Sequence, residues 1–328
     1  MPYVDGFPVQ DHNFALFARD AKESLTPNST QRTTLIVAGV YIVAIFILWC
    51  VHSCFHLRLA RLASSADRRW GDMCRHMPYV SVIIYPFKLL TVGFHEMSHA
   101  FAGVLTCAHI HSIELDPDEG GATRMSGGIP WITLPAGYLG SSLIGAALIA
   151  CGFDTDASKV ASLVLAVFFL FTLWWARRNW LTWLLILGMS GVIVLFWFVA
   201  GGVALRYFVL FIGVMSDMYV LWDVVDDTIA RKVNGSDAAS FAEVCGCCPS
   251  QVWGVLWLII AFAFFAAGVV VGLAAFKESA AQQAEDAKHF LPVPGSSGAM
   301  QLLPASLSSM ALCVAATMAV LLRRSRLV

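Results

Sequence analysis

The stretch that decides the fold is Phe94-His95-Glu96-Met97-Ser98-His99-Ala100, which lies inside an apolar run from Tyr79 to Ala108. On a helix, residues four apart lie about 40° apart around the axis, so His95 and His99 present their imidazoles to one point. Glu96 is offset and can reach a water molecule there. Polar side chains inside an apolar run are costly unless they face partners or a wet cavity. This HExxH spacing therefore predicts a zinc site in which Glu96 acts as the base.

The composition of the whole chain is that of a membrane protein. Of the 328 residues, 58% are hydrophobic and 13% are charged, and the mean hydropathy is +0.72. The apolar stretches are continuous rather than alternating, which favours helices over a barrel. Lys and Arg (21) nearly balance Asp and Glu (22), so no basic field indicates a nucleic-acid partner. We expect an integral, multi-pass, all-α protein in the lipid bilayer.

Apolar runs of about the length that crosses a bilayer, roughly 20 residues, recur along the chain. They cover residues 34–51, 79–108, 129–152, 160–176, 180–200, 203–225, 252–276 and 300–322. The last run contains Pro304 and several serines, so the prediction is seven or eight transmembrane helices. This divides the chain into an exposed N-terminal tail (1–33), a transmembrane core (34–276), a polar, flexible linker (277–299) and a terminal transmembrane helix with a basic tail (300–328).

Three shorter segments carry further signals. Residues 113–125, with two glycines at their centre, suggest a short β-hairpin after the HExxH helix. Residues 137–145 place small side chains at intervals of three to five, which lets another helix approach closely, and we expect that helix to be the one with the histidines. Cys245, Cys247 and Cys248 cluster beside an apolar run. A closed zinc site usually has four ligands, so we interpret them as ordinary or lipidated cysteines.

A zinc site needs a third protein ligand, and the residues alone leave three choices. Asp217 and Asp223 are the main ones, but six residues apart on a helix they point about 120° away from each other, so they cannot easily serve together. His109 and His111 lie in a stretch that alternates like a strand, which could place both on one side. The third ligand is expected to come from far along the chain.

The order of these motifs resembles the site-2-protease clan of intramembrane zinc metalloproteases, in particular its B-like branch of fungal and plant membrane proteins. After the HExxH helix come Leu134-Pro135-Ala136-Gly137-Tyr138-Leu139-Gly140, the acidic stretch from Asp223 to Asp227, and Ser236-Asp237-Ala238. The resemblance covers about residues 80 to 275. It implies that His95, His99 and Asp223 hold zinc and that Glu96 is the catalytic base.

The resemblance also implies an activity, namely cleavage of peptide bonds of a membrane-protein substrate within or beside the bilayer by metal-activated water. An edge strand of the expected hairpin could hold an unwound substrate by strand addition. The alternative is a non-catalytic membrane protein that uses the same residues as a metal-binding scaffold or a transporter. A transporter is disfavoured, because beyond the runs that hold His95 and Asp217 the apolar segments carry almost no ionisable side chains.

Overall fold

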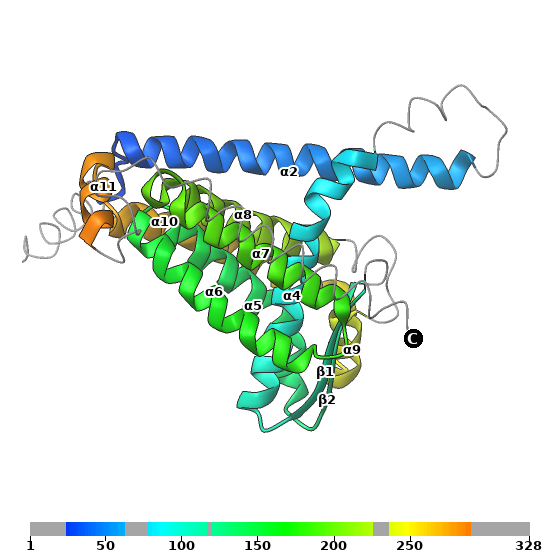
Figure 1. Ribbon diagram of the computed structural model, residues 1–328. Coiled ribbons are helices and arrows are strands. Elements are labelled where there is room, and N and C mark those ends of the chain that lie inside the picture. The colour runs from blue at the N-terminus through cyan, green and yellow to red at the C-terminus, as the bar shows by residue number, and fades with distance from the viewer. Residues whose placement is uncertain (1–23, 63–77, 117–119, 226–235, 290–328) are drawn as a thin grey trace, which may run out of the picture.

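The computed structural model describes residues 24–62, 78–116, 120–225 and 236–289 (Figure 1). Along the chain, these residues form α2 (Ser29–Leu62), α4 (Pro78–Leu105), β1 (His109–Asp116), β2 (Gly120–Ser126), α5 (Pro130–Cys151) and α6 (Thr155–Trp175). They continue with α7 (Trp180–Phe198), the 3-10 turn η1 (Val199–Gly202), α8 (Val203–Val225), α9 (Asp237–Cys245), α10 (Ser250–Ala275) and α11 (Ala280–His289). The protein is thus mainly helical with one pair of strands, as the sequence predicts.

Each of the first seven apolar runs forms a helix, and the eighth lies outside the described residues. Within the described part, five segments are long and apolar enough to cross a membrane. One of them, Trp180–Val224, spans 45 residues and consists of α7 and α8, which pack against each other. The chain turns between them because Ala200, Gly201 and Gly202 adopt positive φ values. The protein is an integral, multi-pass membrane protein, and the count of seven or eight crossings stays a prediction.

Local sequence signals set where several helices begin. The Asp154 carboxylate accepts a hydrogen bond from the Ala157 N–H at the start of α6. The Asn179 side chain accepts from two backbone N–H groups at the start of α7. These side chains satisfy N–H groups that have no partner inside the helix. Pro130 begins α5, where its missing N–H costs nothing.

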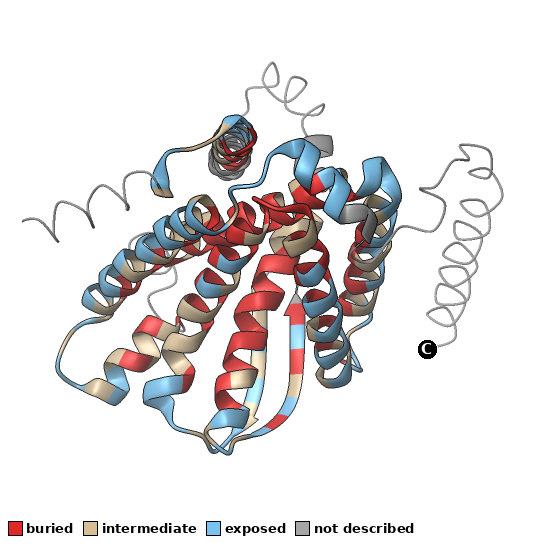
Figure 2. Cartoon of the chain, turned by 90° about the vertical axis from the view of Figure 1, so that its left-hand side faces the viewer, coloured by how far each residue is buried: buried red, intermediate tan, exposed pale blue. Residues whose placement is uncertain are grey.

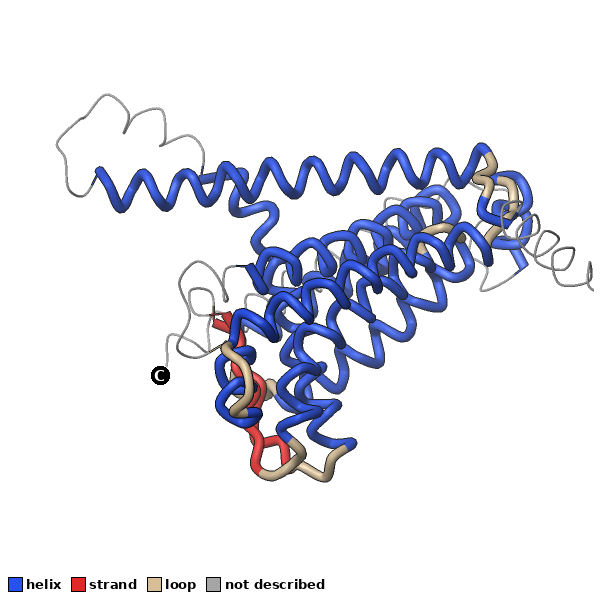
Figure 3. Tube along the Cα trace, turned by 180° about the vertical axis from the view of Figure 1, so that it is seen from behind, coloured by secondary structure: helices blue, strands red, loops and turns tan. Residues whose placement is uncertain are grey.

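The hairpin predicted after the HExxH helix is present. Strands β1 and β2 pair antiparallel, with Asp116 opposite Gly120 and His109 opposite Ser126, and the register is irregular between Ile110 and Ser112. Figure 3 shows the two strands, in red, at one end of the helices. Gly120 and Gly121, the two glycines at the centre of the 113–125 stretch, begin β2. Gly121 is needed there because it packs directly against Glu96.

Helix α5 lies at the centre of the packing, in contact with α4, α8 and α10. Glycines allow these helices to approach closely. A Cβ on Gly213 of α8 would lie 2.7 Å from the Ile149 nitrogen of α5, and a Cβ on Gly140 would lie 2.6 Å from the Ser98 side chain of α4. The small residues of α5 therefore pack against the helix that carries the histidines, as expected, and also against α8.

Burial separates the inside of this bundle from its outer faces (Figure 2). Phe94, Leu205 and Met215 are fully buried, whereas large apolar side chains such as Val164 and Ile259 are exposed. An exposed apolar face of this kind is unfavourable in water and suits the hydrocarbon of a bilayer. The outer surfaces of α6 and α10 are accordingly those of lipid-facing helices.

The segment 277–299, expected to be a polar, flexible linker, contains helix α11 from Ala280 to His289. Helix α11 docks through Gln283, whose side-chain N–H donates to the Phe153 carbonyl and whose Oε1 accepts from Arg206 at 2.7 Å. The sequence Ala-Ala-Gln-Gln-Ala-Glu-Asp-Ala-Lys-His is rich in good helix formers. Gln283 is the buried polar residue of this helix, whereas residues 280–282 and 284–286 are exposed. Residues 290–299 lie outside the described residues.

Candidate metal centre

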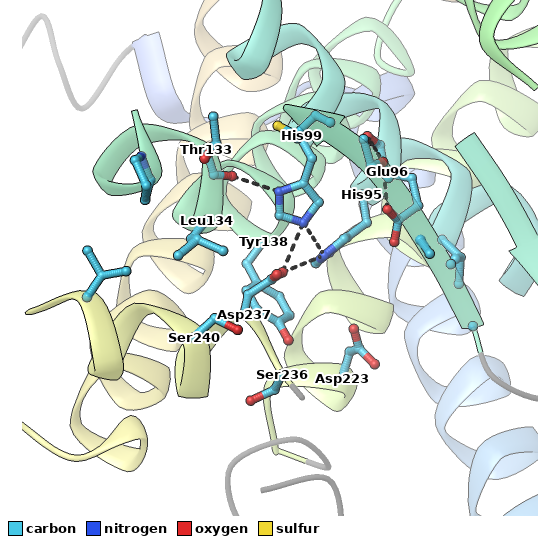
Figure 4. A pocket seen from close by; sticks show the side chains of 18 of the residues that line it. His95, Glu96, His99, Thr133, Leu134, Tyr138, Asp223, Ser236, Asp237 and Ser240 are labelled. Atoms are coloured by element: carbon cyan, nitrogen blue, oxygen red, sulfur yellow. Dashed lines mark hydrogen bonds and ion pairs between the residues drawn. The ribbon is translucent and has the colours of Figure 1, made fainter. Parts of the chain in front are cut away.

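The two histidines of the HExxH motif lie side by side on α4. Their side chains are almost enclosed, since His95 is 9% and His99 6% exposed. The two Nε2 atoms are 3.0 Å apart, as expected for imidazoles one helical turn apart. Both nitrogens point into the same cavity (Figure 4). The sequence predicted this arrangement from the spacing alone.

The acidic partner of the histidines is Asp237, the first residue of α9. Its Oδ2 lies 2.9 Å from His95 Nε2 and 3.0 Å from His99 Nε2. Burial disfavours ionisation of this carboxyl, but His99 and His95 outweigh it and hold the pKa of Asp237 well below its usual range. Asp237 is therefore an ionised carboxylate at neutral pH, the form in which a carboxyl group binds a metal. Across the described residues, these three form the one group of three potential ligands.

Helix α9 is held in place at its start and at its middle. The Ser236 hydroxyl oxygen accepts from the Ala239 N–H and so caps the helix. Phe241 contacts the rings of Trp131, Trp253 and Trp257 at centroid distances of 4.7 to 5.5 Å. These contacts fix the short helix against α5 and α10, which points Asp237 at the imidazoles.

Asp223, the third ligand that the resemblance implies, takes a different place. It lies on α8 and lines the same cavity, but it is not part of the three-ligand group, and in Figure 4 its carboxylate lies apart from the imidazoles. The structure thus brings Asp237 to the position expected for Asp223. The physical reason is that α9 begins at Asp237, whose carboxylate lies within 3.0 Å of both imidazoles. The capped Ser236-Asp237-Ala238 start of α9 was the sequence signal that could have identified it.

The other candidates for the third ligand lie elsewhere. His109 and His111 are exposed on β1, where the His111 Nε2 is hydrogen-bonded to the Ser126 hydroxyl at 3.0 Å. Asp217 is buried between α8 and α5, packed against Gly145. Neither the histidine pair nor Asp217 belongs to the three-ligand group found among the described residues.

A backbone carbonyl orients His99. Its Nδ1–H donates to the Thr133 carbonyl oxygen at 2.7 Å. A donating Nδ1 leaves the lone pair on Nε2, the atom that faces His95 and Asp237. Partners of this kind fix the tautomer and the ring orientation of histidines that bind metals.

Gly137 of α5 leaves the space in which the ligand atoms meet. A Cβ at this position would collide with the Nε2 atoms of both His95 and His99. Tyr138, the next residue, packs its ring edge-on against His95 with the ring centroids 4.7 Å apart. Helix α5 therefore provides both the space around the ligand atoms and one wall that positions an imidazole.

Glu96 is held by strand β2 beside this group. The Thr123 hydroxyl lies 2.7 Å from Glu96 Oε2 and 2.9 Å from the Glu96 backbone carbonyl, so it can donate to either. A Cβ on Gly121 would lie 2.5 to 2.8 Å from the Glu96 side chain. The hairpin therefore fixes the carboxylate by one hydrogen bond and by close contact.

These residues surround a cavity of about 660 Å³. It is lined by His95, Glu96 and His99 from α4, by β2, by the start of α5 and by Asp223, Asp237 and Glu243. Two imidazole nitrogens and one carboxylate oxygen that converge at about 3 Å match the ligand set of catalytic zinc, which uses three protein ligands and keeps one position open. The residues present therefore fit a zinc ion.

An HExxH helix with a further acidic residue provides a ligand set that metallopeptidases use to bind zinc. A family model described as Peptidase M50B-like matches residues 74–268. This match covers more than half of the chain, and the protein belongs to the Peptidase M50B-like family, in agreement with its resemblance to the site-2-protease clan. No curated protein and no solved structure matches it significantly.

Proposed function

We propose that the protein is a zinc-dependent intramembrane endopeptidase that cleaves peptide bonds of membrane proteins within or beside the bilayer. The observation that supports this most directly is the convergence of His95, His99 and Asp237 in a cavity that also contains Glu96. His95, His99 and Asp237 would hold the metal. Zinc, when bound, supplies a Lewis acid that acidifies water and polarises a carbonyl group.

The protein's own residues carry the proton transfers. Glu96 takes a proton from the attacking water and passes it to the leaving amine, which requires a carboxylate that is ionised and correctly placed. Thr123 and Gly121 keep Glu96 in one position. The hydrogen bond from His99 to the Thr133 carbonyl keeps the imidazole fixed while charge develops in the cavity.

The hairpin supports a way to bind the substrate. Strand β2 lines the cavity with residues 120–123 and Met125. In the described part of the chain it pairs only with β1, so its second edge has no strand partner. An extended segment of a membrane protein that added to this edge would lie along the cavity, with its backbone exposed to attack.

The test compares Glu96→Gln with the wild-type protein. Zinc in the purified protein is measured by elemental analysis, and cleavage by mapping new N-termini of membrane proteins in expressing cells. We expect Glu96→Gln to retain zinc and to lower cleavage by about 10²- to 10⁴-fold, the usual contribution of a general base. Glu278→Gln, an exposed change outside the cavity, is the matched control and should behave like wild type.

Two outcomes would overturn the proposal. The purified wild-type protein could contain no zinc, which would remove the metal on which the reaction depends. The new termini could also be identical in cells that carry wild type and Glu96→Gln. That second result would favour the alternative of a scaffold that binds membrane proteins without cutting them.

A further inference from the structure

A second group of reactive side chains lies at the far end of α9. Cys245 is the last residue of this helix, and Gly246 after it adopts a left-handed conformation with φ 65°. The Gly246 N–H donates to the Ala242 carbonyl at 2.8 Å and closes the helix. This turn brings the Cys245 and Cys247 sulfurs to 3.0 Å, and the Cys247 and Cys248 sulfurs to 3.4 Å.

The geometry distinguishes between the two pairs. A disulfide needs its two Cα atoms about 4.4 to 6.8 Å apart. Neighbouring residues such as Cys247 and Cys248 have Cα atoms only about 3.8 Å apart across a trans peptide bond, so this pair is too close to be bridged without distortion. Cys245 and Cys247 are separated by a glycine that turns the backbone, and their sulfurs need to approach by only about 1 Å to bond.

A metal site is disfavoured at this place. A structural zinc site uses four ligands. Among the described residues, three potential ligand atoms converge at His95, His99 and Asp237 but not at the three cysteines. The cysteines also lie in the short connection between α9 and the membrane-length helix α10, where Cys247 is exposed.

We propose that Cys245 and Cys247 form a reversible disulfide site that reacts with a small-molecule disulfide such as glutathione disulfide. The exposed Cys247 thiolate attacks one sulfur of the small molecule, which leaves as a thiolate and takes up a proton. Cys245 then gives up its proton and attacks the Cys247 sulfur of this mixed disulfide, releasing the second thiol. In sum, two protein thiols become one disulfide, and one glutathione disulfide becomes two glutathione thiols.

This site is chemically independent of the proposed peptidase activity, because it uses neither the metal ligands nor Glu96. It acts on the same short helix, however, since Asp237 begins α9 and Cys245 ends it. Ring formation fixes the C-terminal turn in the conformation that the Gly246 hydrogen bond already favours.

The experiment uses the full-length protein in detergent micelles, equilibrated with graded ratios of glutathione and glutathione disulfide. Free thiols are then alkylated, and the peptide that contains Cys245 and Cys247 is identified by mass spectrometry. The oxidised peptide should lack two hydrogen atoms and carry no alkyl group on either residue. Its fraction should rise with glutathione disulfide and fall again when glutathione is restored.

Two variants make the test specific. Cys245→Ser should lose ring closure completely and accumulate glutathione on Cys247, because the second step has no attacking thiol. Cys248→Ser is the matched control and should titrate like wild type. The proposal is overturned if both thiols stay free at every ratio, if Cys247 bonds to Cys248, or if Cys247 of the purified protein carries a thioester-linked acyl chain.

Discussion

At the scale of single residues, one carboxylate oxygen completes the proposed metal centre. Asp237 Oδ2 lies within 3.0 Å of both imidazoles, while Asp223 lines the same cavity apart from them. The neighbouring Glu96 depends on Thr123 for its position. Asp237, the proposed ligand, contacts the imidazoles of α4, and Glu96, the proposed base, contacts Thr123 of β2. Each of these contacts can be tested by one substitution.

Asp237→Ala removes one of the three proposed ligands. Loss of a partner in the outer shell of a metal site already costs about 10- to 100-fold in affinity, so loss of a ligand should weaken zinc binding by more than about 100-fold. Competition with a chelator of known affinity measures this. Asp223→Ala, a change in the same cavity, should keep affinity within about 10-fold of wild type; a reversal of the two results would assign the ligand to Asp223.

Thr123→Val removes the hydroxyl that reaches Glu96 and keeps the shape of the side chain. We expect cleavage of the substrates found by terminus mapping to fall about 10- to 100-fold, the usual effect of an outer-shell partner, with zinc content unchanged. Thr123→Ser keeps the hydroxyl and should retain most of the activity. Equal losses in both variants would show that the methyl group, and not the hydrogen bond, supports Glu96.

At the scale of elements, the site is an intersection of α4, α5, α9 and the hairpin. Helix α5 contributes no ligand, yet its Gly137 leaves room for the imidazole nitrogens and its Thr133 carbonyl orients His99. The same helix packs on α8 and α10 through close glycine contacts with Gly213 and Gly268. The packing of α5 is thus coupled directly to the geometry of the site.

Gly137→Ala tests this coupling. The added Cβ would collide with the Nε2 atoms of both histidines, so at least one ring must turn away and zinc should be lost from the purified protein. Gly188→Ala in α7 is the matched control, because nothing lies within 4 Å of its Cβ position and alanine favours a helix over glycine by about 1 kcal/mol. Zinc retention in Gly137→Ala would contradict the proposed position of the ion.

The sequence predicts the individual helices better than the contacts between residues from distant segments. Apolar runs identified α4, α5 and α8 because bilayer length and helix period leave a strong local pattern. The histidines were found for the same reason, since both lie on one helical turn. The sequence marks Asp237 only as part of the Ser236-Asp237-Ala238 motif, because nothing in local spacing tells which distant segment returns to α4. His95 and Asp237 are 142 residues apart in the sequence, and only the packing of the helices brings them together.

At the scale of the whole molecule, a polar cluster at the end of the helices far from the hairpin joins segments distant in sequence (Figure 1). The Arg206 guanidinium donates to the Gly152 carbonyl, to Gln283 Oε1 and to the Thr34 hydroxyl. The Gln31 side chain donates to the Leu273 and Phe276 carbonyls. Helices α2, α8, α10 and α11 are thereby connected by side-chain hydrogen bonds.

Gln283→Leu should destabilise this end of the protein. It removes the acceptor of Arg206 and the donor to the Phe153 carbonyl, and leaving buried polar groups without partners costs about 1–3 kcal/mol. We expect a lower midpoint of thermal unfolding in detergent, with zinc content unchanged at low temperature. Asp286→Asn, an exposed change on the same helix, should leave the midpoint in place. An unchanged midpoint in Gln283→Leu would show that the hydrogen bonds of Gln283 contribute nothing to stability.

The distance along the chain between the ligands has a consequence for biosynthesis. A growing chain leaves the ribosome with both histidines, and Asp237 follows 138 residues after His99. The helix that carries Asp237 also packs, through Phe241, against Trp253 and Trp257 of α10. The three side chains can therefore be held together only after α10 has been made, so the proposed peptidase would be inactive while its earlier helices are still entering the membrane.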